Sequence, residues 1–262
     1  MDLNLTGRHV LVTGGSKGIG YACAQEFCRE GAHVTLVARQ QAALDAAVAQ
    51  LAAQGFTARA LAADLTDAAA AAAMVAAAER AGGAIDVLVN SAGAARRTPF
   101  EELGPPAWHD AMQAKFFTSV HVMDPVIKRM AGAGRGAIVN VVGAGGKVAG
   151  PTHLAGGSAN AALMLASAGL AAAYGPKGVR VNAVNPGLTL TDRLQEGLAA
   201  DARLQGKSAD EVLAAAQQRL PLRRIATPQE IANAVVFLAS DRASYISGAI
   251  VAMDGAVTPM VV

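Results

Sequence analysis

The chain has 262 residues, and one large α/β domain is the expected organisation, because globular domains take about 100 to 200 residues and single α/β domains often reach about 250. Hydrophobic residues make up 53% of the chain, with alanine prominent among them, so the composition predicts a sizeable core and does not predict a membrane protein. The formal net charge is only +2, which disfavours nucleic acid as a partner.

The apolar segments and the cysteines narrow the class of protein further. The longest unbroken apolar run, Ala68 to Ala78, is shorter than the roughly 20 residues that a transmembrane helix needs. The first residues lack the basic start and continuous apolar core of a signal peptide. Cys23 and Cys28 fall in one expected helix without a His cluster nearby, which favours reduced structural thiols over a metal site. We therefore expect a cytoplasmic protein without a metal ion and without a membrane partner.

Short β-branched runs alternate with longer helical stretches along nearly the whole chain, which is the pattern of βαβ units. This alternation predicts a doubly wound seven-stranded parallel sheet with helices on both faces, in a single domain that covers residues 1–262. The predicted strands are His9–Thr13, Val34–Ala38, Ala58–Ala62, Val87–Asn90, Ala137–Val142, Val179–Val184 and Ala249–Met253.

A glycine-rich loop follows the first strand and leads into a helical run from Tyr21 to Arg29. Its sequence is Thr13-Gly14-Gly15-Ser16-Lys17-Gly18-Ile19-Gly20. Glycines permit a tight turn and a close backbone approach, so that the N–H groups at the start of the helix can face a pyrophosphate. The placement of the loop between a strand and a helix predicts a dinucleotide site.

The second strand ends in Arg39, and no acidic residue stands at its tip. A carboxylate there would bind the ribose diol of NAD, whereas a guanidinium offers paired hydrogen bonds to a 2′-phosphate. Arg39 together with Lys17 therefore favours NADP(H) over NAD(H).

Two later segments suggest a helix start and a lid. Asp67 is expected to cap the alanine-rich helix that begins at Ala68. The segment from Leu188 to Arg224 does not fit the alternation of strands and helices. Because it follows a strand at the carboxyl edge of the sheet, we interpret it as a substrate lid.

The run from Ser158 to Tyr174 contains no charged residue. A helix without a polar face is expected to be buried all round, which predicts a subunit interface and a homo-oligomer, either a dimer or a tetramer. The apolar tail from Ala256 to Val262 is a second candidate contact. One alternative is a helix exposed to water, where its small alanine side chains present little apolar surface. The other is a helix that faces lipid.

The Thr13–Gly20 motif resembles the TGxxxGxG motif of the short-chain dehydrogenases/reductases, and further landmarks keep that family's order and spacing across essentially the whole chain. These are Asp64-Leu65, Asn90-Ser91-Ala92-Gly93, Arg180-Val181-Asn182, Asn185-Pro186-Gly187 with Thr191, and Tyr245-Ile246-Ser247-Gly248. The resemblance, closest to NADP-dependent carbonyl and 3-oxoacyl reductases, implies a single Rossmann domain. It further implies adenine contacts at Asp64 and Leu65, a ribose path along Asn90, Ala92 and Gly93, and a nicotinamide carboxamide site at Pro186, Gly187 and Thr191.

The family's catalytic residues are not found at the positions that the resemblance assigns. The tyrosine position falls on Gly156, the lysine position on Asn160, the serine position on Gly143 and the asparagine position on Lys115. The three tyrosines of the chain are all expected far from the nicotinamide. Loss of a positioned general acid costs about 10²–10⁴ in rate, so ordinary activity requires a substitute.

Three residues are candidates for that substitute. Lys115 and Asn160 look like an exchange of the family's asparagine and lysine, with Asn160 still able to bind the nicotinamide ribose. His153 titrates near neutrality and can deliver a proton; Ser158 is a weaker candidate for polarising a carbonyl. The alternatives are that Lys115 is a solvated lysine, that His153 points elsewhere from its Gly-rich connection, and that Gly156 simply opens the pocket.

Two functions remain open from the sequence. The first is an NADP(H)-dependent oxidoreductase that transfers a hydride between nicotinamide and a carbonyl or alcohol through an altered proton-transfer site. The second is a catalytically inactive NADP-binding protein, either a sensor or a structural subunit, on the same fold. The apolar residues of the lid and of the loop from Gly143 to Leu154 favour a neutral or hydrophobic small-molecule substrate.

Overall fold

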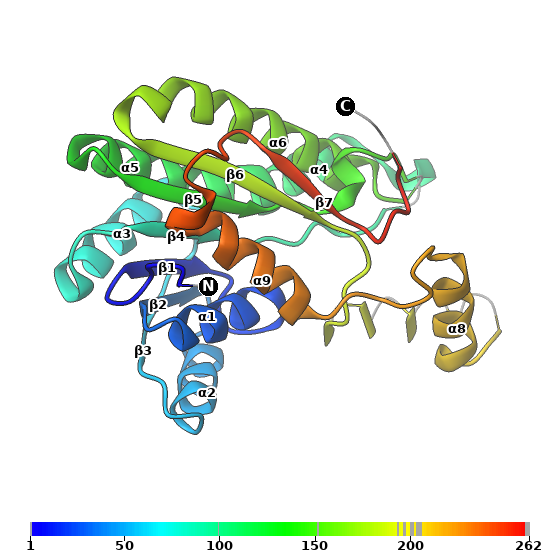
Figure 1. Ribbon diagram of the computed structural model, residues 1–262. Coiled ribbons are helices and arrows are strands. Elements are labelled where there is room, and N and C mark those ends of the chain that lie inside the picture. The colour runs from blue at the N-terminus through cyan, green and yellow to red at the C-terminus, as the bar shows by residue number, and fades with distance from the viewer. Residues whose placement is uncertain are drawn as a thin grey trace.

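The computed structural model describes residues 2–98, 100–150, 152–192, 194–195, 198–199, 202 and 206–259. Its centre is a seven-stranded parallel sheet with the order β3-β2-β1-β4-β5-β6-β7, as Figure 1 shows. The predicted doubly wound fold is therefore confirmed. The strands are β1 His9–Thr13, β2 His33–Ala38, β3 Ala58–Ala62, β4 Val87–Asn90, β5 Gly136–Val141, β6 Val179–Pro186 and β7 Ile250–Met253.

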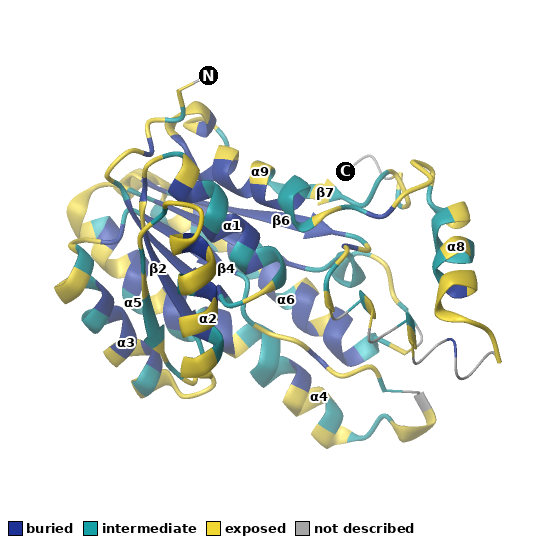
Figure 2. Cartoon of the chain, turned by 90° about the horizontal axis from the view of Figure 1, so that it is seen from below, coloured by how far each residue is buried: buried dark blue, intermediate teal, exposed yellow. Residues whose placement is uncertain are grey.

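Helices cover both faces of the sheet, because alternate residues along each buried strand point to opposite sides. On one face Val10, Val12 and Leu36 pack with α1, α2 and α9. On the other face Leu11, Leu88 and the residues beside them pack with α3, α5 and α6. Figure 2 shows the buried strands between these two layers. The helices are α1 Gly18–Arg29, α2 Gln41–Ala52, α3 Ala68–Gly82, α4 Pro105–Ala111, α5 Thr118–Ala133, α6 Leu154–Tyr174, α8 Ala209–Arg219 and α9 Pro228–Ala239.

Element boundaries differ from the predicted ones in two places that matter for the site. Strand β6 continues past Val184 to Pro186, because Asn185 and Pro186 pair with Ala252 and Met253 of β7. Helix α6 begins at Leu154 instead of Ser158, with His153 as its N-terminal flanking residue. Glycines at 156 and 157 lower helix propensity without preventing the first turn.

Two local predictions are also confirmed. Asp67 caps α3, accepting hydrogen bonds from the backbone N–H groups of Ala69 at 2.7 Å and Ala70 at 3.2 Å. Cys23 and Cys28 are buried free thiols on α1. Burial raises the pKa of Cys28 to about 11, so the thiol is protonated and unreactive at neutral pH.

Helix α6 is not buried all round within one chain. Leu163, Met164 and Ala171 pack into the core beside β6, whereas Leu165 is 77% exposed on the opposite side. By length and composition the helix, with the turn after it, also meets the criterion for a membrane span, but half of that window is buried inside the protein. The uncovered apolar face leaves the subunit interface as a prediction.

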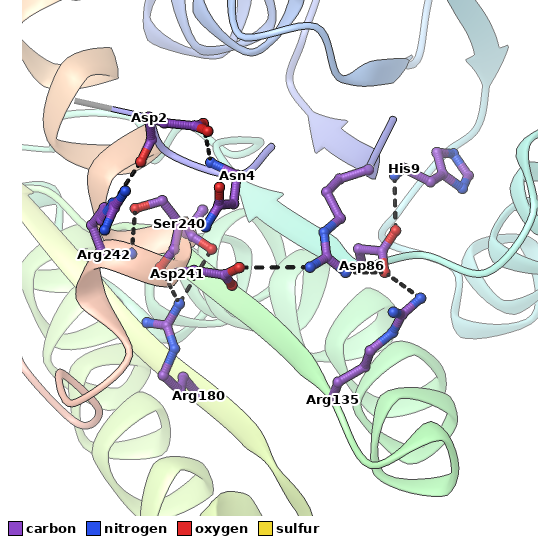
Figure 3. Close-up of polar contacts among 11 residues, drawn as sticks. Asp2, Asn4, His9, Asp86, Arg135, Arg180, Ser240, Asp241 and Arg242 are labelled. Atoms are coloured by element: carbon purple, nitrogen blue, oxygen red, sulfur yellow. Dashed lines mark hydrogen bonds and ion pairs between the residues drawn. The ribbon is translucent and has the colours of Figure 1, made fainter. Parts of the chain in front are cut away.

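The amino ends of the strands are tied together by ionic and backbone hydrogen bonds, drawn in Figure 3. Asp86 accepts from the backbone N–H of His9 at 3.0 Å and pairs with Arg135 at 3.0 Å. Arg180 of β6 donates to the carbonyl oxygens of Leu238 at 2.7 Å and Ser240 at 2.9 Å. The Arg180 guanidinium thus satisfies carbonyl groups at the end of α9 that the helix itself leaves unpaired.

Candidate functional site

The candidate site lies at the carboxyl ends of the strands, where the strand order reverses between β1 and β4. In open α/β sheets this is the place where ligands bind. The glycine loop, the turn after β4 and the segment after β6 all meet there. The sequence predictions for cofactor residues therefore fall on one edge of the molecule.

The glycine loop has a shape that only glycine accommodates. Gly14 has a φ of +67°, and a Cβ on it would lie 2.8 Å from the backbone nitrogen of Ala92. A Cβ on Gly20 would collide with the carbonyl oxygen of Gly14. Lys17 precedes α1 and makes no side-chain cap, so the first N–H groups of the helix have no side-chain acceptor there. This cradle fits an anionic group such as a pyrophosphate.

The turn after β4 is held against the glycine loop. Thr13 Oγ1 accepts from the backbone N–H groups of Ser91 and Ala92, each at 3.2 Å. The Asn90 side chain points into the sheet and donates to Asn140 Oδ1 at 2.9 Å, so its contribution is to fix the strand end. Ala92 and Gly93 line the path that the resemblance assigns to a ribose.

Arg39 and Asp64 lie together at the adenosine end of the site, and both are exposed. Asp64 Oδ1 accepts from the backbone N–H of Thr66 at 3.0 Å and from its hydroxyl at 2.8 Å. These hydrogen bonds, with a smaller contribution from the positive charge of Arg39, lower the pKa of Asp64. Leu65 is buried in the core, so what it offers a ligand is its backbone.

The segment after β6 closes the other end of the site. Gly187 donates from its backbone N–H to Met253 O at 3.1 Å, and a Cβ on it would lie 3.1 Å from Asp254. The Thr191 methyl group lies 3.4 Å from the place where a Cβ on Gly18 would be. Thr191 is thereby brought next to the glycine loop that begins the site.

A π-helical turn, Met112–Phe117, places Lys115 in the site between α4 and α5. Gly93 lies against this turn so closely that a Cβ on it would collide with the carbonyl oxygen of Ala114. Lys115 Nζ donates to Asn160 Oδ1 at 3.0 Å. The two residues that the sequence suggested as an exchange therefore touch each other. The π-helical turn itself left no signal in the sequence pattern, although such turns occur often at functional sites.

The His153 imidazole lies between two glycines. A Cβ on Gly156 would collide with His153 Cε1 and lie 2.9 Å from Nδ1, and a Cβ on Gly145 would lie 2.8 Å from Cδ2. The ring therefore fills the space in which a side chain at position 156 would begin. Gly145 belongs to a short 3-10 turn, Ala144–Gly146, that sequence reasoning did not single out. Ser158 is exposed on α6, away from this group.

The predicted lid falls partly outside the described residues, at 193, 196, 197, 200, 201 and 203–205. Its described parts include Thr189, which forms a bridge with Ala226, and helix α8, which begins with a capping box between Ser208 and Glu211. Figure 1 shows α8 standing to the side of the sheet. Of the apolar tail, residues 260–262 also lie outside the described range.

The comparisons with known proteins agree with this geometry. The family described as enoyl-(acyl carrier protein) reductase matches residues 14–258. The D-threitol dehydrogenase of Mycolicibacterium smegmatis is 37% identical over 260 residues, which cover 98% of this chain and 95% of the relative.

Two solved structures share the fold along the whole chain. The L-sorbose reductase of Gluconobacter frateurii, complexed with NADPH and L-sorbose, has a TM-score of 0.94 and 30% identity, with 100% of both chains covered. An NADPH-bound short-chain oxidoreductase of Pseudomonas aeruginosa PAO1, described as containing an atypical catalytic centre, has a TM-score of 0.88 and 32% identity, covering 98% of this chain and 99% of that one. The chain therefore belongs to the short-chain dehydrogenase/reductase family of oxidoreductases.

Proposed function

We propose that the protein is an NADP(H)-dependent oxidoreductase that interconverts a carbonyl and an alcohol, with His153 in the place of the family's tyrosine. The observation that carries the proposal is the position of the imidazole, which fills the space beside Gly156 and Gly145. Asn160, on the helix that begins directly after His153, accepts a hydrogen bond from Lys115 of the π-helical turn. The proposal thus accounts together for Gly156, Asn160 and Lys115 at the family's tyrosine, lysine and asparagine positions.

The residues of the cradle fit NADP(H), which when bound supplies or accepts the hydride. Two solved relatives are described with NADPH, and Arg39 stands where a 2′-phosphate would need a cation. We assign the pyrophosphate to the loop after β1, the 2′-phosphate to Arg39 with Lys17, and the remaining parts to the segments after β3, β4 and β6. The residues are Gly14, Ser16, Lys17, Gly18, Ile19, Gly20, Arg39, Asp64, Leu65, Asn90, Ala92, Gly93, Pro186, Gly187 and Thr191.

His153 is the group that we assign to proton transfer. As a carbonyl carbon gains a hydride, its oxygen becomes an alkoxide, and the imidazolium gives that oxygen a proton and becomes neutral imidazole. In the reverse direction the neutral ring takes the proton from the alcohol. A positioned acid of this kind is worth about 10²–10⁴ in rate. The Lys115 ammonium, held by Asn160, stabilises the negative charge that develops on the oxygen.

Several further assignments belong to the same proposal. The substrate is a small neutral carbonyl or alcohol compound, and the relatives named for D-threitol and L-sorbose make those two compounds sensible first tests. Residues 188–224 act as the lid over that substrate. The uncovered apolar face of α6 forms the interface of a homo-oligomer, a dimer or a tetramer. The protein acts in the cytoplasm.

The test is NADPH oxidation by the purified protein with L-sorbose, other ketones, aldehydes and acyl thioesters, and NADP⁺ reduction with D-threitol. NADPH binding is recorded by fluorescence in the same samples. We expect turnover with at least one compound, a fall of about 10²–10⁴ in kcat in His153→Gln, and no change in the matched control His109→Gln, whose side chain is exposed on α4. Tight NADPH binding without turnover would instead favour the non-catalytic NADP-binding protein, and full activity in His153→Gln would refute the assigned role of the imidazole.

A further inference from the structure

We propose that the Asn160 side-chain amide, oriented by Lys115, donates a hydrogen bond to the substrate's carbonyl oxygen beside Gly143. This inference rests on the proposed function and gives Asn160 a role at the reacting oxygen in place of the ribose. The observation behind it is that the oxygen and the nitrogen of the Asn160 carboxamide have different surroundings.

The oxygen end of Asn160 is identified by chemistry. Asn160 is 2% exposed, and the atom that it presents to Lys115 Nζ at 3.0 Å must be an acceptor, because an ammonium only donates hydrogen bonds. The carboxamide therefore cannot be flipped without opposing an NH₂ group to an ammonium. Lys115 thus fixes which end of the side chain faces the rest of the site.

The nitrogen end has no acceptor among the described residues. Asn160 Nδ2 is buried, and no hydrogen-bond partner for it is found in that part of the chain. A buried donor without an acceptor is unfavourable, and such groups in proteins commonly mark a place that a ligand or a bound water satisfies. This donor lies in the site, on α6, which begins directly after His153.

The surroundings of Nδ2 include two glycines. A Cβ on Gly143 would lie 3.2 Å from Nδ2, so the amide faces the space that a side chain at 143 would fill. A Cβ on Gly145 would lie 3.9 Å from the same nitrogen. Both neighbours are glycines, and neither provides a side chain that would cover the donor.

The same point in space brings the amide and the imidazole together. The Cβ position on Gly145 is 3.9 Å from Asn160 Nδ2, 2.8 Å from His153 Cδ2 and 3.5 Å from His153 Nε2. Both groups therefore border the same turn, and we place the substrate's carbonyl oxygen between them, where it accepts a hydrogen bond from the amide while it receives a proton from the ring. Asn160 is then a catalytic residue, and Lys115, besides the charge stabilisation proposed above, positions it.

The first arm of the test is kinetic and uses the whole protein. Asn160→Asp keeps the size of the side chain and the contact with Lys115 but removes the donor. We expect kcat to fall about 10²–10³-fold, as for loss of one oxyanion donor, with the Kd for NADPH unchanged within about twofold. Asn233→Asp, exposed on α9, is the matched control. A tenfold or larger rise in the Kd for NADPH would place Asn160 on the ribose and overturn the inference, as would an unchanged kcat.

The role of Lys115 is tested by whether a hydrogen-bond donor at position 115 is needed to orient the Asn160 carboxamide. Lys115→Arg retains a donor for Asn160 Oδ1, and Lys115→Met does not. We expect kcat to fall about tenfold or more in the Met variant with KM little changed, and the Arg variant to recover most of the loss. Equal activity in both variants would overturn the positioning role.

The second arm does not depend on turnover. In protein labelled with ¹⁵N-asparagine, the Asn160 NH₂ resonance is identified by its absence from Asn160→Asp. Cyclohexanone, a neutral ketone with one acceptor, is added to the wild-type complex with NADP⁺. A shift of this resonance supports the inference even if no substrate is turned over, in which case the proposed function alone fails. No shift at concentrations of ketone that saturate binding overturns it.

Discussion

Gly156→Ala should disable the site although it adds only a methyl group. A Cβ at this position collides with His153 Cε1 and lies 2.9 Å from both His153 Nδ1 and Ala95 Cβ. Alanine favours the helix by about 1 kcal/mol over glycine, while overpacking costs about 1–3 kcal/mol, so the net loss of stability is about 0–2 kcal/mol. The His153 imidazole, which is the proposed proton donor, must therefore move. We therefore expect kcat to fall about 10²–10⁴-fold.

The measurement is kcat with NADPH and the best ketone of the panel, beside thermal unfolding of the same samples. Gly169→Ala on the same helix is the control, because a Cβ there meets nothing within 4 Å. It should leave kcat unchanged and raise the stability by about 1 kcal/mol, which is about 2–4 °C in Tm for a domain of this size. Size-exclusion chromatography of both variants shows whether subunit assembly is altered.

One result would refute this reasoning. If Gly156→Ala folds and retains wild-type kcat and KM, the chemistry does not depend on the ring position that the structure shows. A loss of Tm far above the expected range would instead show that the helix start cannot relax around the added methyl group. In that case the activity of His153→Gln decides the role of the imidazole.

Other perturbations test the cofactor site, a helix cap and a buried base. Arg39→Ala should weaken NADPH binding about 10–100-fold and leave NADH binding nearly unchanged in fluorescence titrations, because a charge-assisted hydrogen bond is worth about 1.5–3 kcal/mol; equal effects on both cofactors would contradict the 2′-phosphate assignment. Asp67→Ala should lower the free energy of unfolding by about 1 kcal/mol in urea titrations through loss of the α3 cap, and no change would contradict it. Burial lowers the pKa of His9 below its ordinary value of 6.5, so the unfolded chain takes up the proton first as the pH falls. Stability should therefore decline below about pH 6.5, and the urea midpoint should drop more on acidification in the wild type than in His9→Gln.

The fold was predictable because its determinants are local and repeated. Each strand is a short β-branched run, and each crossover helix is long enough to cover a face, so the alternation of the two defines a parallel sheet. The glycine loop and the Asp67 cap were predictable for a similar reason, since a turn or a cap depends on residues that adjoin it. The start of α6 expected at Ser158 was wrong, because Gly156 and Gly157 lower helix propensity without preventing the first turn at Leu154.

The geometry of the catalytic groups was not predictable in the same way. The direction of the His153 ring depends on Gly145 and Gly156 together, one before it in a 3-10 turn and one after it in α6. The contact between Lys115 and Asn160 depends on a π-helical turn, whose hydrogen bonds have no signature in the sequence. The exchange of residue types at these two positions suggested that they meet, but only the structure gives the atoms that touch.

The close packing of the turn Ala144–Gly146 on α6 has a consequence for altering the substrate range in the laboratory. A Cβ on Gly157 would lie 2.6 Å from the carbonyl oxygen of Gly145, and one on Gly146 would lie 2.9 Å from the backbone nitrogen of Ala161. This wall of the site tolerates almost no added volume, so random libraries directed at it should yield mainly inactive clones. Residues 188–192 and 206–224 belong to the proposed lid, and libraries placed there should yield most of the variants with new specificity.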